Sequence, residues 1–249
     1  HRIADLAALR RLAYALTQGL TAVHNPAIDL AAARDIARTE LDSAIGGGDT
    51  RSLTRIREVL PEVIDIAETG QAPALSTPWP DLDRLIGGIA PGRLVVIGAR
   101  PGHGKSLAGT NLALHTAHHH GHAALIASIE MPRQEVVQRL VAAHAGVNIN
   151  GLINARVVEP EWEKIRRHFD AINDLPIYIE DGSEQSVTSI RAAAKEVLRD
   201  RADLALIVVD YLQLMSTPDS NRSSSRAERL GAVTRGLKVL ARETNTCVV

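Results

Sequence analysis

Apolar positions in the first seventy residues recur at the three- and four-residue spacing of amphipathic helices. They include Ile3, Leu6, Leu9, Leu12, Leu16 and Leu20. The pattern predicts one helix over about residues 2–23, a break at Asn25-Pro26, and a second helix over about 29–45 that starts at an Asp29 cap and stops at glycines 46–48. We expect these two helices to form an antiparallel hairpin.

A third amphipathic stretch, over about residues 51–69, follows the glycines and ends at Gly70. Pro61 lies inside it, and proline cannot donate the backbone hydrogen bond of a helix interior, so we expect a kink or a restart there. Residues 71–80 are rich in Pro, Ser and Thr, which is typical of a linker. The sequence therefore predicts a domain boundary in this segment.

Beyond the linker, short apolar runs alternate with amphipathic helical patterns. The predicted strands are 94–98, 124–129, 176–180 and 204–210, with another starting near Cys247. The predicted helices are 105–119, 133–145, 160–171, 187–200 and 226–243. Such alternation indicates an α/β fold with a mostly parallel sheet and helices on both faces. Ligands bind at the carboxyl ends of the strands in such sheets.

Charge and composition limit the classes of function. The 249 residues carry 28 Lys and Arg against 29 Asp and Glu, a net charge of -1, so any DNA contact must be local. Two Trp, three Tyr and one Phe are too few for a groove of base-stacking platforms. A single cysteine excludes an internal disulfide and a cysteine-based zinc site. No apolar run reaches the roughly 18 to 20 residues that span a bilayer, so we expect a cytoplasmic protein without membrane contact.

A glycine-rich segment between the first predicted strand and its following helix has the pattern of a phosphate-binding loop. Its residues are Gly98, Ala99, Arg100, Pro101, Gly102, His103, Gly104, Lys105 and Ser106. Glycines let successive backbone N–H groups face phosphate oxygens, and the helix adds the positive end of its dipole. In this pattern Lys105 reaches the β- and γ-phosphates and the Ser106 hydroxyl is placed for Mg²⁺. The plain alternative is a glycine-rich turn before a helix.

Two acids end neighbouring predicted strands. Asp210 closes the run Leu206–Asp210, where it could support the Mg²⁺ shell, although an Asp can also simply cap a strand end. Glu130 follows Ile126–Ile129, where it could polarise the attacking water. Glu130 could equally be a first-turn acid of the next helix, favoured by the helix dipole.

Four separated motifs, in order, resemble the DnaB replicative DNA helicase family. They are residues 77–88 (Thr-Pro-Trp-Pro-Asp-Leu-Asp-Arg-Leu-Ile-Gly-Gly), the Ala99-Arg100-Pro101 that precedes Gly104-Lys105-Ser106, residues 128–132 (Ser-Ile-Glu-Met-Pro), and residues 210–215 (Asp-Tyr-Leu-Gln-Leu-Met). Residues 235–243 also resemble the family's next helix. Ala99, a departure from the strict phosphate-loop pattern, is common in this family. The likeness covers 76–249 well and 1–70 weakly.

The resemblance implies a RecA-like P-loop core preceded by an all-α hairpin and a linker helix. Residues 1–46 would then be the end of the helical N-terminal domain, 47–75 the linker helix and linker, and 76–249 the ATPase domain. It implies that Lys105 and Ser106 bind ATP and Mg²⁺, that Glu130 activates water, and that Asp210 supports the metal. It further implies a homo-hexameric ring around single-stranded DNA, with primase and a helicase loader as candidate partners.

The resemblance also places a sensor glutamine, DNA-contacting loops and an arginine finger after Val249. From the chain as written we therefore expect nucleotide binding with weak or no unwinding. Two alternatives stay open: another RecA-like ATPase such as a RadA-like recombination factor, and a nucleotide-binding scaffold without hydrolysis. His115 and His119, in the histidine-rich segment 115–122, have a metal-compatible spacing, but a solvated helix end is the favoured interpretation.

Overall fold

The computed structural model describes residues 2–24, 30–45, 55–69, 74–100, 102–182, 185–210 and 226–249. The chain divides into two compact units, His1–Ala72 and Pro73–Val249. The three-part division at 46/47 and 75/76 stays a prediction. The predicted Asp29 cap, the break at Asn25-Pro26 and the glycines 46–48 lie outside the described residues.

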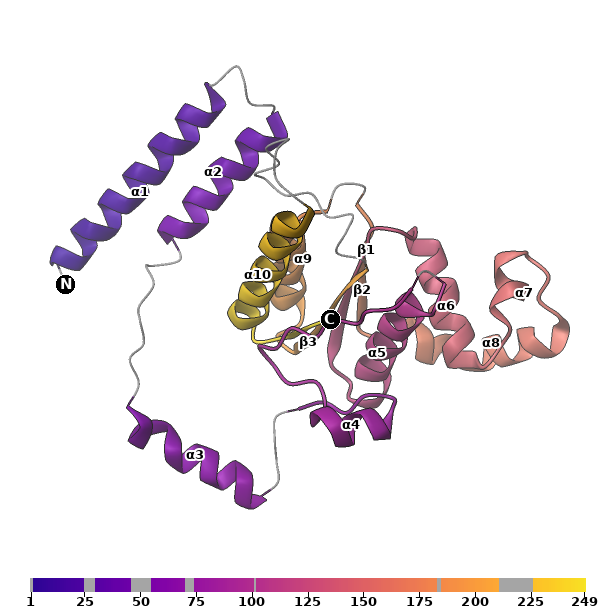
Figure 1. The fold of residues 1–249 in the computed structure, drawn as a ribbon. Helices are drawn as coiled ribbons and strands as arrows, with labels where there is room; N and C mark the ends of the chain where they lie inside the picture. The colour runs from indigo at the N-terminus through magenta and orange to yellow at the C-terminus, as the bar shows by residue number, and fades with distance from the viewer. Residues whose placement is uncertain are drawn as a thin grey trace. The chain divides into compact units, whose positions relative to one another are not determined.

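The first unit contains the predicted helical hairpin. Helices α1 (Arg2–Val23) and α2 (Leu30–Ile45) pack against each other and run in opposite directions (Figure 1). Small side chains allow the close approach: a Cβ added at Gly19 would lie 3.2 Å from the Cβ of Ala37. Among the side chains whose placement the structure describes in this pair, the buried apolar ones are Ala15, Ala22 and Ala33. At these positions small side chains let the two helix backbones approach closely.

The third helix, α3 (Ile56–Thr69), is continuous through Pro61, so a restart, one of the two expected outcomes, is wrong, and the kink stays a prediction. Pro61 is the sixth residue of the helix, and its ring removes one internal hydrogen bond without ending the helix. None of the side chains of α3 is buried, although its apolar residues share one face.

The second unit is built on a parallel sheet of four strands. These are β1 (Ala123–Ser128), β2 (Ile177–Glu180), β3 (Leu204–Asp210) and β4 (Cys247–Val248), in the order β2-β1-β3-β4. Ala127 pairs with Glu180 and Ser128 with Asp210, so the carboxyl ends of the three longer strands lie level at one edge. The predicted α/β fold with a mostly parallel sheet is confirmed.

Helices cover both faces of this sheet (Figure 1). On one face α9 (Val187–Asp200) and α10 (Arg226–Thr244) pack on Leu125 and Ile207; on the other, α5 (Lys105–His119) and α6 (Arg133–Ala145) pack on Ile126 and Leu206. Every residue of β1 is buried. Burial on both faces explains why β1 and β3 are continuous apolar runs in the sequence rather than alternating ones.

The predicted strand 94–98 is wrong in its extent. Leu94 makes only an isolated parallel bridge to Val248, supported by a 2.8 Å hydrogen bond from the Val95 N–H to the Val248 carbonyl. Val96 and Ile97 are 61% and 38% exposed. Among the described residues this segment pairs with β4 through a single bridge, which is too little backbone pairing to make a regular strand.

Two short helices escaped prediction, while α8 (Glu159–Asn173) matches its predicted range closely. The helix α4 (Pro80–Ile86) follows the linker, and the Asp83 carboxylate accepts from the Thr77 N–H at 2.9 Å. The other, α7 (Ile149–Ile153), has five residues. Such short helices carry too few turns for a periodic signal. Within the described part of the chain, no helix is both long and apolar enough to cross a membrane.

Candidate functional site

The loop before α5 has the backbone geometry of a phosphate cradle. Gly102 and Gly104 have φ angles of +76° and +81°, a region that side chains disfavour. Gly104 is the N-cap residue of α5, and no side chain of the described residues caps the helix there. The first N–H groups of α5 are thus available to an anionic ligand at the positive end of the helix dipole. Pro101, predicted in this loop, lies outside the described residues.

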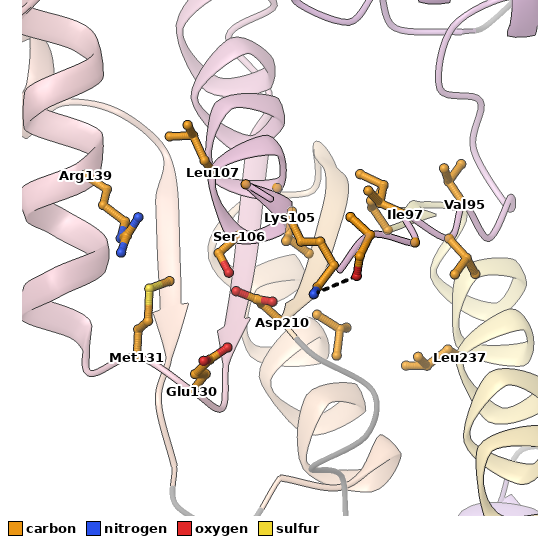
Figure 2. A pocket seen from close by; sticks show the side chains of 18 of the residues that line it. Val95, Ile97, Lys105, Ser106, Leu107, Glu130, Met131, Arg139, Asp210 and Leu237 are labelled. Carbon is orange, nitrogen blue, oxygen red and sulfur yellow. Dashed lines mark hydrogen bonds between the residues drawn. The ribbon is translucent and has the colours of Figure 1, made fainter. Parts of the chain in front are cut away.

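Lys105 and Ser106 form the first turn of α5. The Lys105 ammonium donates to the Ala99 carbonyl at 3.1 Å, so its side chain folds back over the loop (Figure 2). A charged amine that bonds a neutral carbonyl of its own loop can exchange that contact for phosphate oxygens at little cost.

A cavity of about 790 Å³ opens at the carboxyl edge of the sheet. Of the predicted site residues, the cavity is lined by Ala99, Gly102, Gly104, Lys105, Ser106, Glu130 and Asp210. Figure 2 shows Lys105, Ser106, Glu130 and Asp210 gathered around one space, although they come from three separate segments. Arg100 and His103 belong to the loop but do not line the cavity.

Asp210 ends β3 with an incomplete set of hydrogen bonds. The residue is 8% exposed, and its Oδ2 atom is buried with no hydrogen-bond partner among the described residues. A buried carboxylate oxygen without a partner is costly, so such atoms often face a metal ion or ligand. Carboxylate and hydroxyl oxygens are the donors that Mg²⁺ prefers, and Asp210 and Ser106 line the same cavity (Figure 2). The residues present therefore fit a magnesium ion.

Glu130 lies in the turn that follows β1. The buried Ser128 hydroxyl donates to the Met131 carbonyl at 2.8 Å and accepts from the Met131 N–H at 3.3 Å, which closes this turn around Glu130. The Ile129 N–H donates to the Asp210 carbonyl at 2.9 Å, so the turn stays attached to β3. Glu130 precedes α6, which starts at Arg133, so its interpretation as a first-turn acid of that helix is wrong.

Sequence reasoning missed two charged residues of the cavity wall, Glu135 and Arg139 of α6. The Arg139 guanidinium binds the Glu135 carboxylate at 2.7 Å, and the Arg139 Nε is buried with no hydrogen-bond partner in the described ranges. Their four-residue spacing on a helix, acid before base, was the available signal, but it is common on solvated helix faces.

The histidines at the end of α5 contact one another and the linker. Ser76 Oγ lies 3.2 Å from His115 Nε2 and 3.0 Å from His120 Nε2, and the rings of His115 and His119 stack at 4.8 Å. Within the described ranges, no group of three or more His, Cys, Asp or Glu side chains could hold a metal ion.

Comparison with known families identifies the second unit. Residues 74–249 match the model of the DnaB-like helicase C terminal domain. The chain belongs to this family. The predicted resemblance is thereby confirmed, and membership in this family of ATP-dependent DNA helicases implies ATP binding.

Curated relatives agree with the family model. The chain is 31% identical to the replicative DNA helicase DnaB of Leifsonia xyli, over 99% of this chain and 54% of the relative. It is 34% identical to a probable replicative DNA helicase of Trieres chinensis, over 70% of this chain and 38% of that protein. The chain thus spans about half or less of the length of these relatives.

Solved structures share the fold. One of them, the structure of an ATPase domain, superimposes with a TM-score of 0.71 at 26% identity, covering 81% of this chain and 70% of that one. A DnaB-like replicative helicase, studied for its interactions with primase, superimposes with a TM-score of 0.69 at 24% identity, over 99% of this chain and 58% of that one.

Proposed function

We propose that this chain binds ATP with Mg²⁺ and hydrolyses the γ-phosphate as the motor of a hexameric DNA helicase of the DnaB type. One observation carries the proposal: Lys105, Ser106, Glu130 and Asp210 line one cavity at the carboxyl edge of the sheet. A cation, a hydroxyl and two acids around one space suit phosphoryl transfer, in which positioning and charge stabilisation supply most of the catalysis.

Each residue has a distinct task in this proposal. The N–H groups at the start of α5 and the Lys105 ammonium hold the β- and γ-phosphates. Ser106 and Asp210 would hold Mg²⁺, which when bound neutralises charge on the phosphate oxygens. Glu130, which lines the same cavity, accepts a proton from the attacking water.

The assembly and its partners rest on family membership. We propose a homo-hexamer that moves along single-stranded DNA and separates the strands at a replication fork, with primase and a helicase loader as partners. The grip on DNA would be through phosphates, because a motor that moves past every sequence cannot depend on base identity.

The test is ATP hydrolysis by the intact protein with and without single-stranded DNA. We expect DNA to stimulate hydrolysis, and Lys105→Ala to abolish both hydrolysis and nucleotide binding. Asp210→Asn should remove the dependence of nucleotide binding on Mg²⁺. Lys164→Ala is the matched control, since Lys164 also donates to a carbonyl, that of Gly146 at 3.4 Å, but lies on α8.

Indifference of hydrolysis to single-stranded DNA would contradict the helicase proposal. Nucleotide binding without hydrolysis by the intact protein would favour a nucleotide-binding scaffold instead. Loss of binding in both Lys105→Ala and the Lys164→Ala control would mean that the phosphate-loop assignment is wrong.

A further inference from the structure

Glu130 lies in a short bridge between the end of β1 and the start of α6. The position of its carboxylate therefore depends on how firmly the two ends of this bridge are held. At the α6 end the N-cap residue is Pro132, which provides no side-chain cap. An uncapped helix start normally frays, and fraying here would reach Glu130 within three residues.

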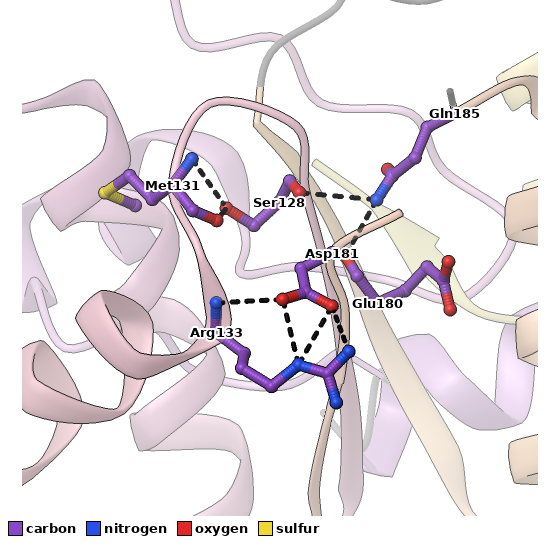
Figure 3. Close-up of polar contacts among 6 residues, drawn as sticks. All are labelled: Ser128, Met131, Arg133, Glu180, Asp181 and Gln185. Carbon is purple, nitrogen blue, oxygen red and sulfur yellow. Dashed lines mark hydrogen bonds and ion pairs between the residues drawn. The ribbon is translucent and has the colours of Figure 1, made fainter. Parts of the chain in front are cut away.

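Asp181 supplies the missing cap from a different element. It directly follows β2, and its Oδ2 accepts a 3.1 Å hydrogen bond from the backbone N–H of Arg133, the first residue of α6. The same carboxylate accepts from the Arg133 guanidinium, at 2.9 Å and 3.0 Å from Nε and at 2.5 Å from Nη2 (Figure 3). The Asp181 side chain is 15% exposed and that of Arg133 is 66% exposed, so the backbone hydrogen bond is the better shielded part of this contact.

These contacts make a strong attachment. A carboxylate that accepts both a helix-start N–H and a bidentate guanidinium combines capping, the helix dipole and a charge-assisted pair. The Arg133 guanidinium also holds the pKa of the Asp181 carboxyl below its ordinary value. The start of α6 is thus fastened to the carboxyl end of β2.

The β1 end of the bridge is fastened to the same place. The buried Gln185 amide donates to the Glu180 carbonyl at 2.8 Å and to the Ser128 carbonyl at 3.3 Å, which joins the ends of β2 and β1 (Figure 3). Ser128 in turn closes the turn that contains Glu130. Both ends of the bridge are therefore held by residues that follow β2.

We propose that Asp181 is a positioning residue for Glu130. By capping α6 and pairing with Arg133, it fixes the turn so that the Glu130 carboxylate stays on the cavity wall opposite Lys105 and Ser106. This inference rests on the proposed function of Glu130. It assigns no contact between Asp181 and nucleotide, so its effect must act through Glu130.

A double-mutant cycle on the intact protein tests this proposal. We expect Asp181→Ala to lower the kcat of ATP hydrolysis roughly ten- to hundredfold, the scale of a misplaced catalytic group, with nucleotide affinity unchanged within about twofold. Asp181→Asn should fall between, because its amide oxygen still accepts from the Arg133 N–H but lacks the charge. In a Glu130→Gln background, Asp181→Ala should lower the remaining rate no further.

Asp203→Ala is the matched control. Asp203 also takes a bidentate guanidinium, from Arg201 at 2.9 Å and 2.7 Å, but it precedes β3 at the opposite edge of the sheet. We expect its removal to leave kcat unchanged.

Three results would overturn the inference while leaving the proposed role of Glu130 intact. The first is an equal fall in kcat when Asp181→Ala is introduced with Glu130 intact or replaced. The second is a wild-type kcat in folded Asp181→Asn and Asp181→Ala, with folding verified by circular dichroism; should Asp181→Ala not fold, Asp181→Asn decides. The third is an equal fall in the Asp203→Ala control. If Glu130→Gln itself leaves kcat unchanged, the proposed role of Glu130 fails and the inference fails with it.

Discussion

At Gly109 the helix after the phosphate loop lies close to the sheet, and replacing this glycine should separate the two. It lies on α5, about one turn after Lys105 and Ser106, and is buried. A Cβ built at Gly109 would lie 2.8 Å from the Cγ1 of Val208 on β3. That distance falls about 0.6 Å short of the 3.4 Å at which ordinary contact begins. Something must therefore shift in Gly109→Ala, and we expect α5, and Ser106 with it, to move away from the strand that carries Asp210.

Two opposing effects determine how much Gly109→Ala changes the free energy of unfolding. Overpacking a core costs about 1 to 3 kcal/mol, whereas Ala in place of Gly in a helix interior gains about 1 kcal/mol. We expect a net loss of up to about 2 kcal/mol in the free energy of unfolding, by combining these two ranges. Val208 is buried and β-branched, so the rotation of its side chain away from the new methyl group is restricted. Nucleotide affinity should fall as well, because Ser106 and Asp210 move apart.

The assay is urea unfolding followed by tryptophan fluorescence. Trp79 and Trp162 both lie in the second unit, so their signal is specific to it. In a Val208→Ala background the clash is gone, and Gly109→Ala should become neutral or stabilising, with a coupling of about 1 to 3 kcal/mol. Gly231→Ala is the control: Gly231 is exposed on α10 with nothing within 4 Å of an added Cβ, so it should stabilise by up to about 1 kcal/mol. An equal effect of Gly109→Ala in both backgrounds would refute the argument.

Two further predictions concern titratable groups. Burial lowers the pKa of His115, as do the neighbouring His119 and His120, while Asp83 acts in the opposite direction. Just below pH 6.5 the unfolded chain therefore binds more protons than the folded one, so the melting temperature should drop as the pH falls from 7.5 to 5.5. His115→Gln should make the melting temperature depend less on pH. An equal slope in both proteins would count against this account. Burial raises the pKa of the Cys247 thiol to about 11, so a thiol reagent at pH 8 should modify this cysteine only as fast as the protein unfolds. Rapid modification of the folded protein would contradict the burial of Cys247.

Much of the fold was predictable because its signals are local. Helical spacing marked α1, α2, α5, α6, α9 and α10, and continuous apolar runs marked β1 and β3, since buried parallel strands have no polar face. Segment 94–98 misled because an apolar run does not show whether its backbone pairs with a neighbouring strand along its whole length. The short helices α4 and α7 have too few turns to show a hydrophobic period. They depend on specific contacts, such as the hydrogen bond from the Thr77 N–H to the Asp83 carboxylate, that no repeating pattern in the sequence marks.

Some features of the candidate site could likewise be predicted from local sequence, and others could not. The sequence by itself determined the glycine turn, the lysine and serine at the helix start, and the two acids after apolar runs, because each lies within a few residues of its structural signal. Only the tertiary structure decided that these groups share one cavity, that an oxygen of Asp210 has no partner among the described residues, and that Asp181 caps a helix 48 residues before it in the chain. Those facts follow from the strand register Ser128–Asp210 and Ala127–Glu180. Register is set by the packing of both faces of the sheet, and no short stretch of sequence contains it.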